Sequence, residues 1–140
     1  MRIKTIADFK IGDRESFTKT VTETDVYLFA GITGDFAPQH VNAHYAKQTK
    51  FGERIAHGIL TAGLVSSALA RLVSPGGITL SHTFTFPAPV RFGDTITAEV
   101  EVTNIDPEKR LLHLRTICKN QKDEIVLDGT AVEKFPKPHK

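Results

Sequence analysis

Residues 56–70 read Ala56-His-Gly-Ile-Leu-Thr-Ala-Gly-Leu-Val-Ser-Ser-Ala-Leu-Ala70, and this stretch decides the fold. It has no formally charged side chain apart from His57 when protonated, and it is rich in Ala, Gly, Ser and Leu. Such a composition predicts a helix that is buried nearly all round. A membrane span needs about 20 apolar residues. This run is shorter and contains polar side chains, so we predict a helix of the protein core.

The segment after this helix changes its hydrophobic period from helical to two. Ser74-Pro-Gly-Gly77 breaks the helix, and apolar side chains then alternate with Thr and Ser over 78–86. The pattern repeats over 96–103, 109–119 and 125–135, with turns at 106–109 and 120–123. We therefore predict four strands, the last three of them antiparallel neighbours joined by tight turns. The apolar face of the first strand consists of Ile78, Leu80, His82, Phe84 and Phe86.

The segment before the buried helix is predicted to contain less regular secondary structure. Residues 16–21 predict a short lead-in strand, and Thr22-Glu-Thr-Asp25 has the spacing of a capping box for a helix that ends at Gly34. Pro38 disfavours helical geometry at the residue before it, so we expect 35–39 to form an extended or kinked loop. Asp35 and His40 are thus expected on irregular backbone next to helix ends, with Asn42 capping a further turn.

These elements predict one α+β domain that fills residues 1–140. An antiparallel sheet buries such a helix only by curling around it, which is the outline of a hot-dog fold: a curved antiparallel sheet wrapped around a central buried helix. One sheet on one helix leaves a sheet edge and a helix end uncovered. A homodimer or a higher homo-oligomer that covers both is therefore expected.

Composition excludes several classes of function. Charged residues make up 24% of the chain, both signs are interspersed and the net charge is +2, so we predict no nucleic-acid or membrane partner. The single cysteine, Cys118, rules out an internal disulfide framework and suits a buried strand position. His44 and His82 lack partners at metal-ligand spacing, so no metal is expected. An N-terminal segment without an apolar stretch predicts a cytoplasmic location, and residues 135–140 predict a frayed tail.

Two short motifs carry residues suited to chemistry. Asp35 and His40 lie five residues apart on a segment shaped by Gly and Pro, where a carboxylate and an imidazole suit proton transfer. An Asp after Gly is also a common turn residue, so spacing alone leaves a structural role open. Gly58 lies at the start of the buried helix, where free amide groups bind a ligand oxygen. Simple packing of the helix start explains this glycine equally well.

Four blocks of the chain resemble, in the same order, the signature blocks of MaoC-like (R)-specific enoyl-CoA hydratases. The blocks are residues 18–25, 29–40, 51–58 and 86–94, and the resemblance runs from Phe9 to Phe135. It implies reversible syn hydration of a trans-2-enoyl-CoA to an (R)-3-hydroxyacyl-CoA in fatty acid metabolism, without metal or cofactor. It further implies Asp35 as the base toward water and His40 as the partner acid, with exchange of these roles left open. The amide of Gly58 would polarise the thioester carbonyl.

His57 precedes Gly58 in the family motif, and Ile59 and Phe86 are candidates for the lining of an acyl pocket. His57, Ile59 and Phe86 are expected to bind the acyl-CoA or acyl-carrier substrate, against the alternative that they serve helix capping and core packing. One position departs from the family motif: Ala37 stands where the motif has Asn. Two alternatives stay open: an acyl-CoA thioesterase, since hot-dog folds also host thioesterases, and a non-catalytic acyl-CoA-binding subunit in which Ala37 reflects lost chemistry.

Overall fold

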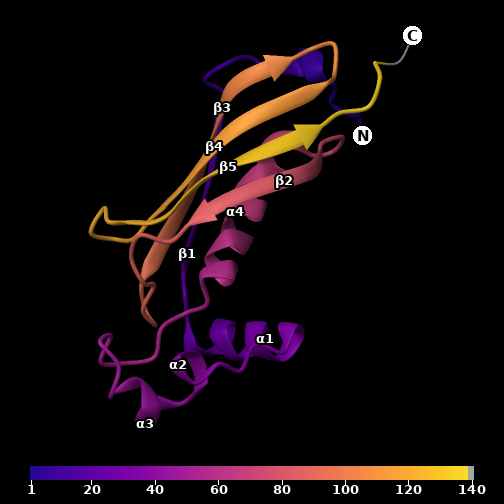
Figure 1. Ribbon diagram of the computed structural model, residues 1–140. Helices are drawn as coiled ribbons and strands as arrows, with labels where there is room; N and C mark the ends of the chain where they lie inside the picture. Colours follow the sequence, from indigo (N-terminus) through magenta and orange to yellow (C-terminus); the bar gives the residue numbers. More distant parts are fainter. Residues whose placement is uncertain (139–140) are drawn as a thin grey trace.

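The computed structural model describes residues 1–138 of the chain. A 3-10 turn at Ile6–Asp8 precedes strand β1 and four helices, and the other four strands follow (Figure 1). The elements are β1 (Arg14–Thr20), α1 (Glu23–Thr33), α2 (Pro38–Val41), α3 (Ala43–Ala46), α4 (Gly58–Val73), β2 (Ile78–Thr85), β3 (Thr95–Asp106), β4 (Leu111–Lys119) and β5 (Ile125–Lys134).

All five strands form one antiparallel sheet in the order β1-β3-β4-β5-β2. The sheet curves along one side of α4, and α1 to α3 lie beyond the N-terminal end of that helix (Figure 1). Alternate residues of β3 point to the helix and are fully buried, as the period-two pattern predicted: Ile96, Ala98, Val100 and Val102. The predicted α+β arrangement, with three consecutive antiparallel strands β3, β4 and β5, is confirmed.

Strand β2 does not present the single apolar face that its sequence predicted. The register against β5 shifts between Thr79 and Ser81, so the alternation is interrupted at Leu80. Thr79 bonds to the buried Glu133, while Ile78 and Leu80 remain 66% and 59% exposed. Because β2 is an edge strand, nothing in the described chain covers these two side chains. The prediction of one continuous apolar face was therefore wrong.

Helix α4 is less enclosed than its composition predicted. Val65, Ala68 and Leu69 pack against the sheet at 0–2% exposure. The sheet covers only one side, however, and a stripe of residues on the other side is exposed: Ile59, Gly63, Ser66 and Ala70. The expectation of a helix buried nearly all round was thus wrong for the single chain. Its bounds also move, from 56–70 to Gly58–Val73.

The segment before α4 agrees with the prediction over α1 and differs from it at α2, where an irregular loop was predicted. Thr22 caps α1 through a full capping box, and Gly34 ends it in the left-handed region with φ of 82°. Asp35 lies on irregular backbone, as expected. His40 does not, because Pro38 starts the one-turn helix α2 as its first residue. Asn42 caps α3 by accepting a hydrogen bond from the amide of Tyr45.

The C-terminal segment is tied down further than predicted. Phe135 is 1% exposed, its ring lies 4.9 Å from that of Phe9, and its amide bonds to the carbonyl of Arg110. The predicted frayed tail is therefore wrong at residue 135, and its last two residues lie outside the described part of the chain. Cys118 is fully buried, and burial raises the pKa of its thiol to about 12. Within residues 1–138, no helix has the length and apolar character to span a membrane.

Candidate active site

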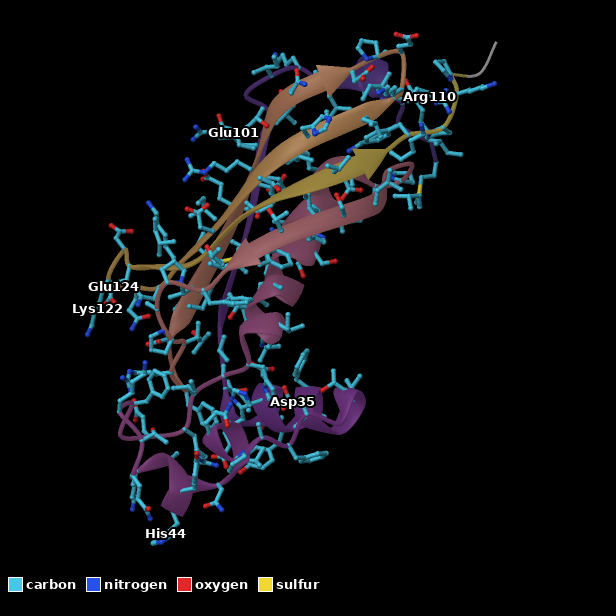
Figure 2. The ribbon with its side chains drawn as sticks, in the orientation of Figure 1. Asp35, His44, Glu101, Arg110, Lys122 and Glu124 are labelled. Atoms are coloured by element: carbon cyan, nitrogen blue, oxygen red, sulfur yellow. The ribbon has the colours of Figure 1, made fainter. Side chains whose placement is uncertain are left out.

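Asp35 is held by local hydrogen bonds just after the end of α1. Its amide donates to Oγ1 of Thr33 at 3.3 Å, and its Oδ1 accepts from the amide of Ala37 at 3.2 Å. The second bond closes a turn of the type that Asp favours, in which the side chain mimics a backbone acceptor. The carboxylate is exposed, and it lies near the N-terminal end of α4 (Figure 2).

His40 is buried, and its hydrogen bond defines its tautomer. Its side chain is only 7% exposed, and Nδ1 lies 2.7 Å from the carbonyl oxygen of Ile55. A carbonyl oxygen only accepts, so Nδ1–H donates, and Nε2 of the neutral ring keeps a free lone pair. Burial lowers the pKa of His40 below its ordinary value of 6.5, and the His57 imidazole lowers it further. The bond to Ile55 and the charge of Asp35 act in the opposite direction.

His57 lies between these two residues rather than in a substrate pocket. It is the residue before α4 and is 2% exposed. Its Nε2 lies 2.9 Å from the backbone carbonyl oxygen of Asp35, to which Nε2–H donates. Its ring stacks on that of His40 with centroids 3.9 Å apart, and the ring of Phe29 packs 4.7 Å away.

The amide groups of Gly58 and Ile59 precede the first hydrogen bond of α4, which the amide of Leu60 donates to the carbonyl of His57. They therefore present partial positive charge at the start of a 16-residue helix. The ring of Phe86 packs directly on Gly58, because a Cβ built there would lie 2.9–3.1 Å from three of its ring atoms. A side chain at position 58 would therefore displace the ring of Phe86, whichever function the amide of Gly58 has.

A cavity of about 380 Å³ opens at this end of the molecule. Of the predicted site residues, His40, Gly58, Ile59 and Phe86 line it, whereas Asp35 and His57 do not. The other lining residues are mostly apolar: Lys50, Phe51, Ile55, Ala56, Thr61, Pro87, Ala88, Pro89, Val90 and Val126. An apolar cavity with few polar groups suits an acyl chain with one reactive end.

A second grouping joins Asp35, His40 and His57. One side-chain ligand atom from each of Asp35, His40 and His57 lies within 4.8 Å of the other two. Such a cluster has the composition of a metal site. Each ring already donates one N–H to a backbone carbonyl, of Ile55 for His40 and of Asp35 for His57, which leaves one nitrogen of each ring as an acceptor. The cluster can therefore hold a small polar molecule by hydrogen bonds without an ion.

His40 belongs to both groupings and connects the exposed carboxylate to the cavity. Sequence reasoning missed two further residues of the site. Ile55 acts through its backbone carbonyl, which leaves no trace in residue type. Thr61 lines the cavity with a buried hydroxyl that has no partner within the described residues, and its position one turn after Gly58 was the available signal.

The chain is similar in sequence to a known protein family. The family profile described as MaoC like domain matches residues 9–124. The (R)-specific enoyl-CoA hydratase of Rhodospirillum rubrum is 46% identical over 130 residues, which cover 92% of this chain and 90% of the relative. The 3-hydroxybutyryl-CoA dehydratase of Methylorubrum extorquens is 45% identical over 138 residues, 98% and 87% of the two chains.

Solved structures show the same fold. The unliganded R-hydratase PhaJ1 from Pseudomonas aeruginosa superposes with a TM-score of 0.88 and 38% identity, over 96% of this chain and 86% of that one. The (R)-hydratase of Aeromonas caviae, described as involved in PHA biosynthesis, gives 0.87 and 35%, over 91% and 98%. A curved antiparallel sheet on one long helix defines the class as an α+β hot-dog protein. Within that class, the chain belongs to the MaoC-like dehydratase family.

Proposed function

We propose that this protein is an (R)-specific enoyl-CoA hydratase and 3-hydroxyacyl-CoA dehydratase, a hydro-lyase that adds water reversibly to a trans-2-enoyl thioester. One observation carries the proposal: His40 faces a cavity that also contains Gly58, while it shares a cluster with Asp35. Relatives named for this reaction, at 35–46% identity over more than nine tenths of the chain, support it.

The substrate thioester would lie with its carbonyl oxygen at the start of α4. The amide of Gly58 would donate to this oxygen, which gains negative charge as water adds to the β-carbon. A donor placed for such an oxyanion is worth about 3–4 kcal/mol. Ile59 and Phe86 would contact the acyl group, since both line the cavity beside Gly58.

A single water molecule would bridge Asp35 and His40. Two hydrogen bonds of about 2.8 Å that meet at one oxygen span about 4.5 Å, close to the limit of 4.8 Å between the ligand atoms. The free Nε2 lone pair of His40 would take a proton from this water as its oxygen bonds to the β-carbon. The same proton would then pass to the α-carbon on the same face, which gives syn addition and restores the neutral ring.

This scheme exchanges the roles that the resemblance implied. The tautomer and the lowered pKa of His40 favour the neutral ring, so we propose His40 as the base. Asp35 would hold the second hydrogen of the water and stabilise the imidazolium while it exists. No cofactor or metal takes part in this scheme.

We also propose that the active form is a homodimer. Edge strand β2 exposes Ile78 and Leu80, and α4 exposes the stripe that begins at Ile59. A second copy placed along β2 would cover these side chains and the free backbone groups of the edge. A single domain, a cytoplasmic location, a role in fatty acid metabolism and the choice between CoA and carrier-protein thioesters stay predictions.

The test is an assay with crotonyl-CoA that follows enoyl absorbance and free thiol together. Hydration predicts loss of absorbance without thiol release, and chiral chromatography should show the (R)-3-hydroxy product. Asp35→Asn and His40→Gln should each lower the rate by about 10²–10⁴-fold. His44→Gln is the matched control, because His44 lies on α3 far from Asp35 (Figure 2).

Each contrary result has a definite meaning. Thiol release by the wild type would indicate a thioesterase. Binding of acyl-CoA without turnover, unaffected by Asp35→Asn, would indicate a non-catalytic subunit. Full hydration activity in Asp35→Asn would contradict the assignment of the site.

A further inference from the structure

We infer that His57 is a positioning residue that holds Asp35, His40 and the amide of Gly58 in one arrangement, rather than a residue that binds substrate. This inference rests on the proposed function and adds a residue to it. The ring is 2% exposed and does not line the cavity, so it has no access to a ligand there. Apart from the packing of Phe29, its contacts go instead to parts of the proposed machinery.

The first contact anchors the peptide of Asp35. The other hydrogen bonds around this peptide are local: the amide of Asp35 donates to Thr33, the amide of Phe36 to the carbonyl of Gly34, and the amide of Ala37 to the carboxylate. The bond from Nε2–H of His57 to the carbonyl of Asp35 joins residues 22 apart in sequence. It therefore ties an otherwise exposed loop to the rigid start of α4.

The second contact fixes the ring of His40. The hydrogen bond to Ile55 fixes the position of Nδ1, but by itself it lets the plane of the ring rotate about that hydrogen bond. Stacking on His57, at 3.9 Å and 28°, restrains the plane of the ring and hence the direction of Nε2. Phe29 packs on His57 and restrains it in turn. The titratable groups that face His57 are His40 and Asp35.

The third connection is covalent, since His57 directly precedes Gly58. The position of the proposed carbonyl donor is thereby linked to the positions of the base and the carboxylate. A displacement of about 1 Å in such a site costs about 10²-fold in rate. One side chain that links three groups is thus expected to affect turnover more than substrate binding.

The test separates the two noncovalent contacts. In His57→Phe the ring face remains and the hydrogen bond is lost, whereas in His57→Gln an N–H donor remains at a similar reach and the ring is lost. We expect His57→Phe to lower kcat for crotonyl-CoA hydration at least tenfold, with KM changed by less than about threefold. His57→Gln should recover part of the loss. His44→Gln is again the control.

Hydrogen exchange gives a readout that needs no activity. The amides of Phe36 and Ala37 should exchange faster in His57→Phe than in the wild type, with the exchange of β3 and β4 unchanged. Wild-type kcat and wild-type exchange in His57→Phe would overturn the inference, and so would faster exchange spread evenly over the sheet. If the wild type does not hydrate crotonyl-CoA, the proposed function fails, while faster loop exchange in His57→Phe still supports the anchoring of Asp35.

Discussion

The backbone amide of Ala37 donates a hydrogen bond to Oδ1 of Asp35 at 3.2 Å. Ala37 is the position where the chain departs from the family motif, and its methyl side chain has no hydrogen-bonding group. The carboxylate is nevertheless oriented at this point, because the donor belongs to the main chain and any residue except proline supplies it. The departure at Ala37 therefore leaves the orientation of Asp35 intact.

The first prediction follows from this bond. Ala37→Asn should change kcat by less than about threefold, because the amide donor is already present. Ala37→Pro removes the donor while its φ of −54° remains suitable for proline, so kcat should fall about tenfold. Steady-state kinetics with crotonyl-CoA and thermal unfolding of each variant check this. A large gain of activity in Ala37→Asn would show that the missing side chain limits the enzyme.

The contact between Gly58 and Phe86 yields the second prediction. Gly58→Ala places a methyl group within 2.9–3.1 Å of the Phe86 ring, which must move. Because Phe86 is 44% exposed and its ring can shift, the cost should be about 1 kcal/mol, the lower end of the range for overpacking, and the displaced ring should also lower kcat/KM. Replacing the ring in Gly58→Ala with Phe86→Leu should restore most of the stability, as measured by thermal unfolding. Additive losses in the double variant would contradict the contact.

The sequence predicted the parts of the fold that depend on local pattern. Alternate residues of β3 could be assigned to the core because every second position faces α4, and Thr22 and Gly34 mark the ends of α1 by their own chemistry. The shift at Leu80 was not predictable, since register depends on the partner strand. The exposed stripe of α4 likewise depends on how much of the helix the sheet covers.

The candidate site also has a part that the sequence predicted and a part that it did not. Asp35, His40 and Gly58 were predicted mainly from the resemblance of four ordered blocks to a family, and the structure brings them to one end of α4. The role of His57 was not visible, because its hydrogen bond goes to a backbone carbonyl 22 residues away. Residue identity constrains such an acceptor very little, so only the folded geometry shows it.

The third prediction concerns the pH dependence of activity. Burial lowers the pKa of His40 below 6.5, and the proposed base is the neutral ring. Rate should therefore be maximal at neutral pH and fall on acidification, with an inflection below pH 6.5. The Asp35 carboxylate raises the pKa of His40, so Asp35→Asn should move the titration of the His40 ring to still lower pH, as NMR would show. An inflection above 6.5 would contradict the neutral base.

The same shift predicts a pH dependence of stability. The unfolded chain binds a proton at His40 more readily than the folded protein does, so the free energy of unfolding rises with pH. The contribution of His40 is fully present above 6.5 and is lost as pH falls through the lower folded-state pKa. Urea unfolding at about pH 7.5 and about pH 5 should show a smaller difference for His40→Gln than for the wild type. Equal differences in the two proteins would mean that burial of His40 does not affect its titration.

The last prediction tests the proposed dimer at its edge strand. Leu80 lies on β2 and is 59% exposed, and a copy paired along this edge would bury it. A lysine there would place a charge in that contact, because long charged side chains are the usual protection of sheet edges against pairing. Leu80→Lys should therefore shift the protein from dimer toward monomer in sedimentation experiments. Ile11→Lys is the matched control, since Ile11 is 67% exposed in a turn before β1 and should leave the dimer unchanged. A dimer that withstands Leu80→Lys would place the contact elsewhere, with the exposed stripe of α4 as the next surface to substitute.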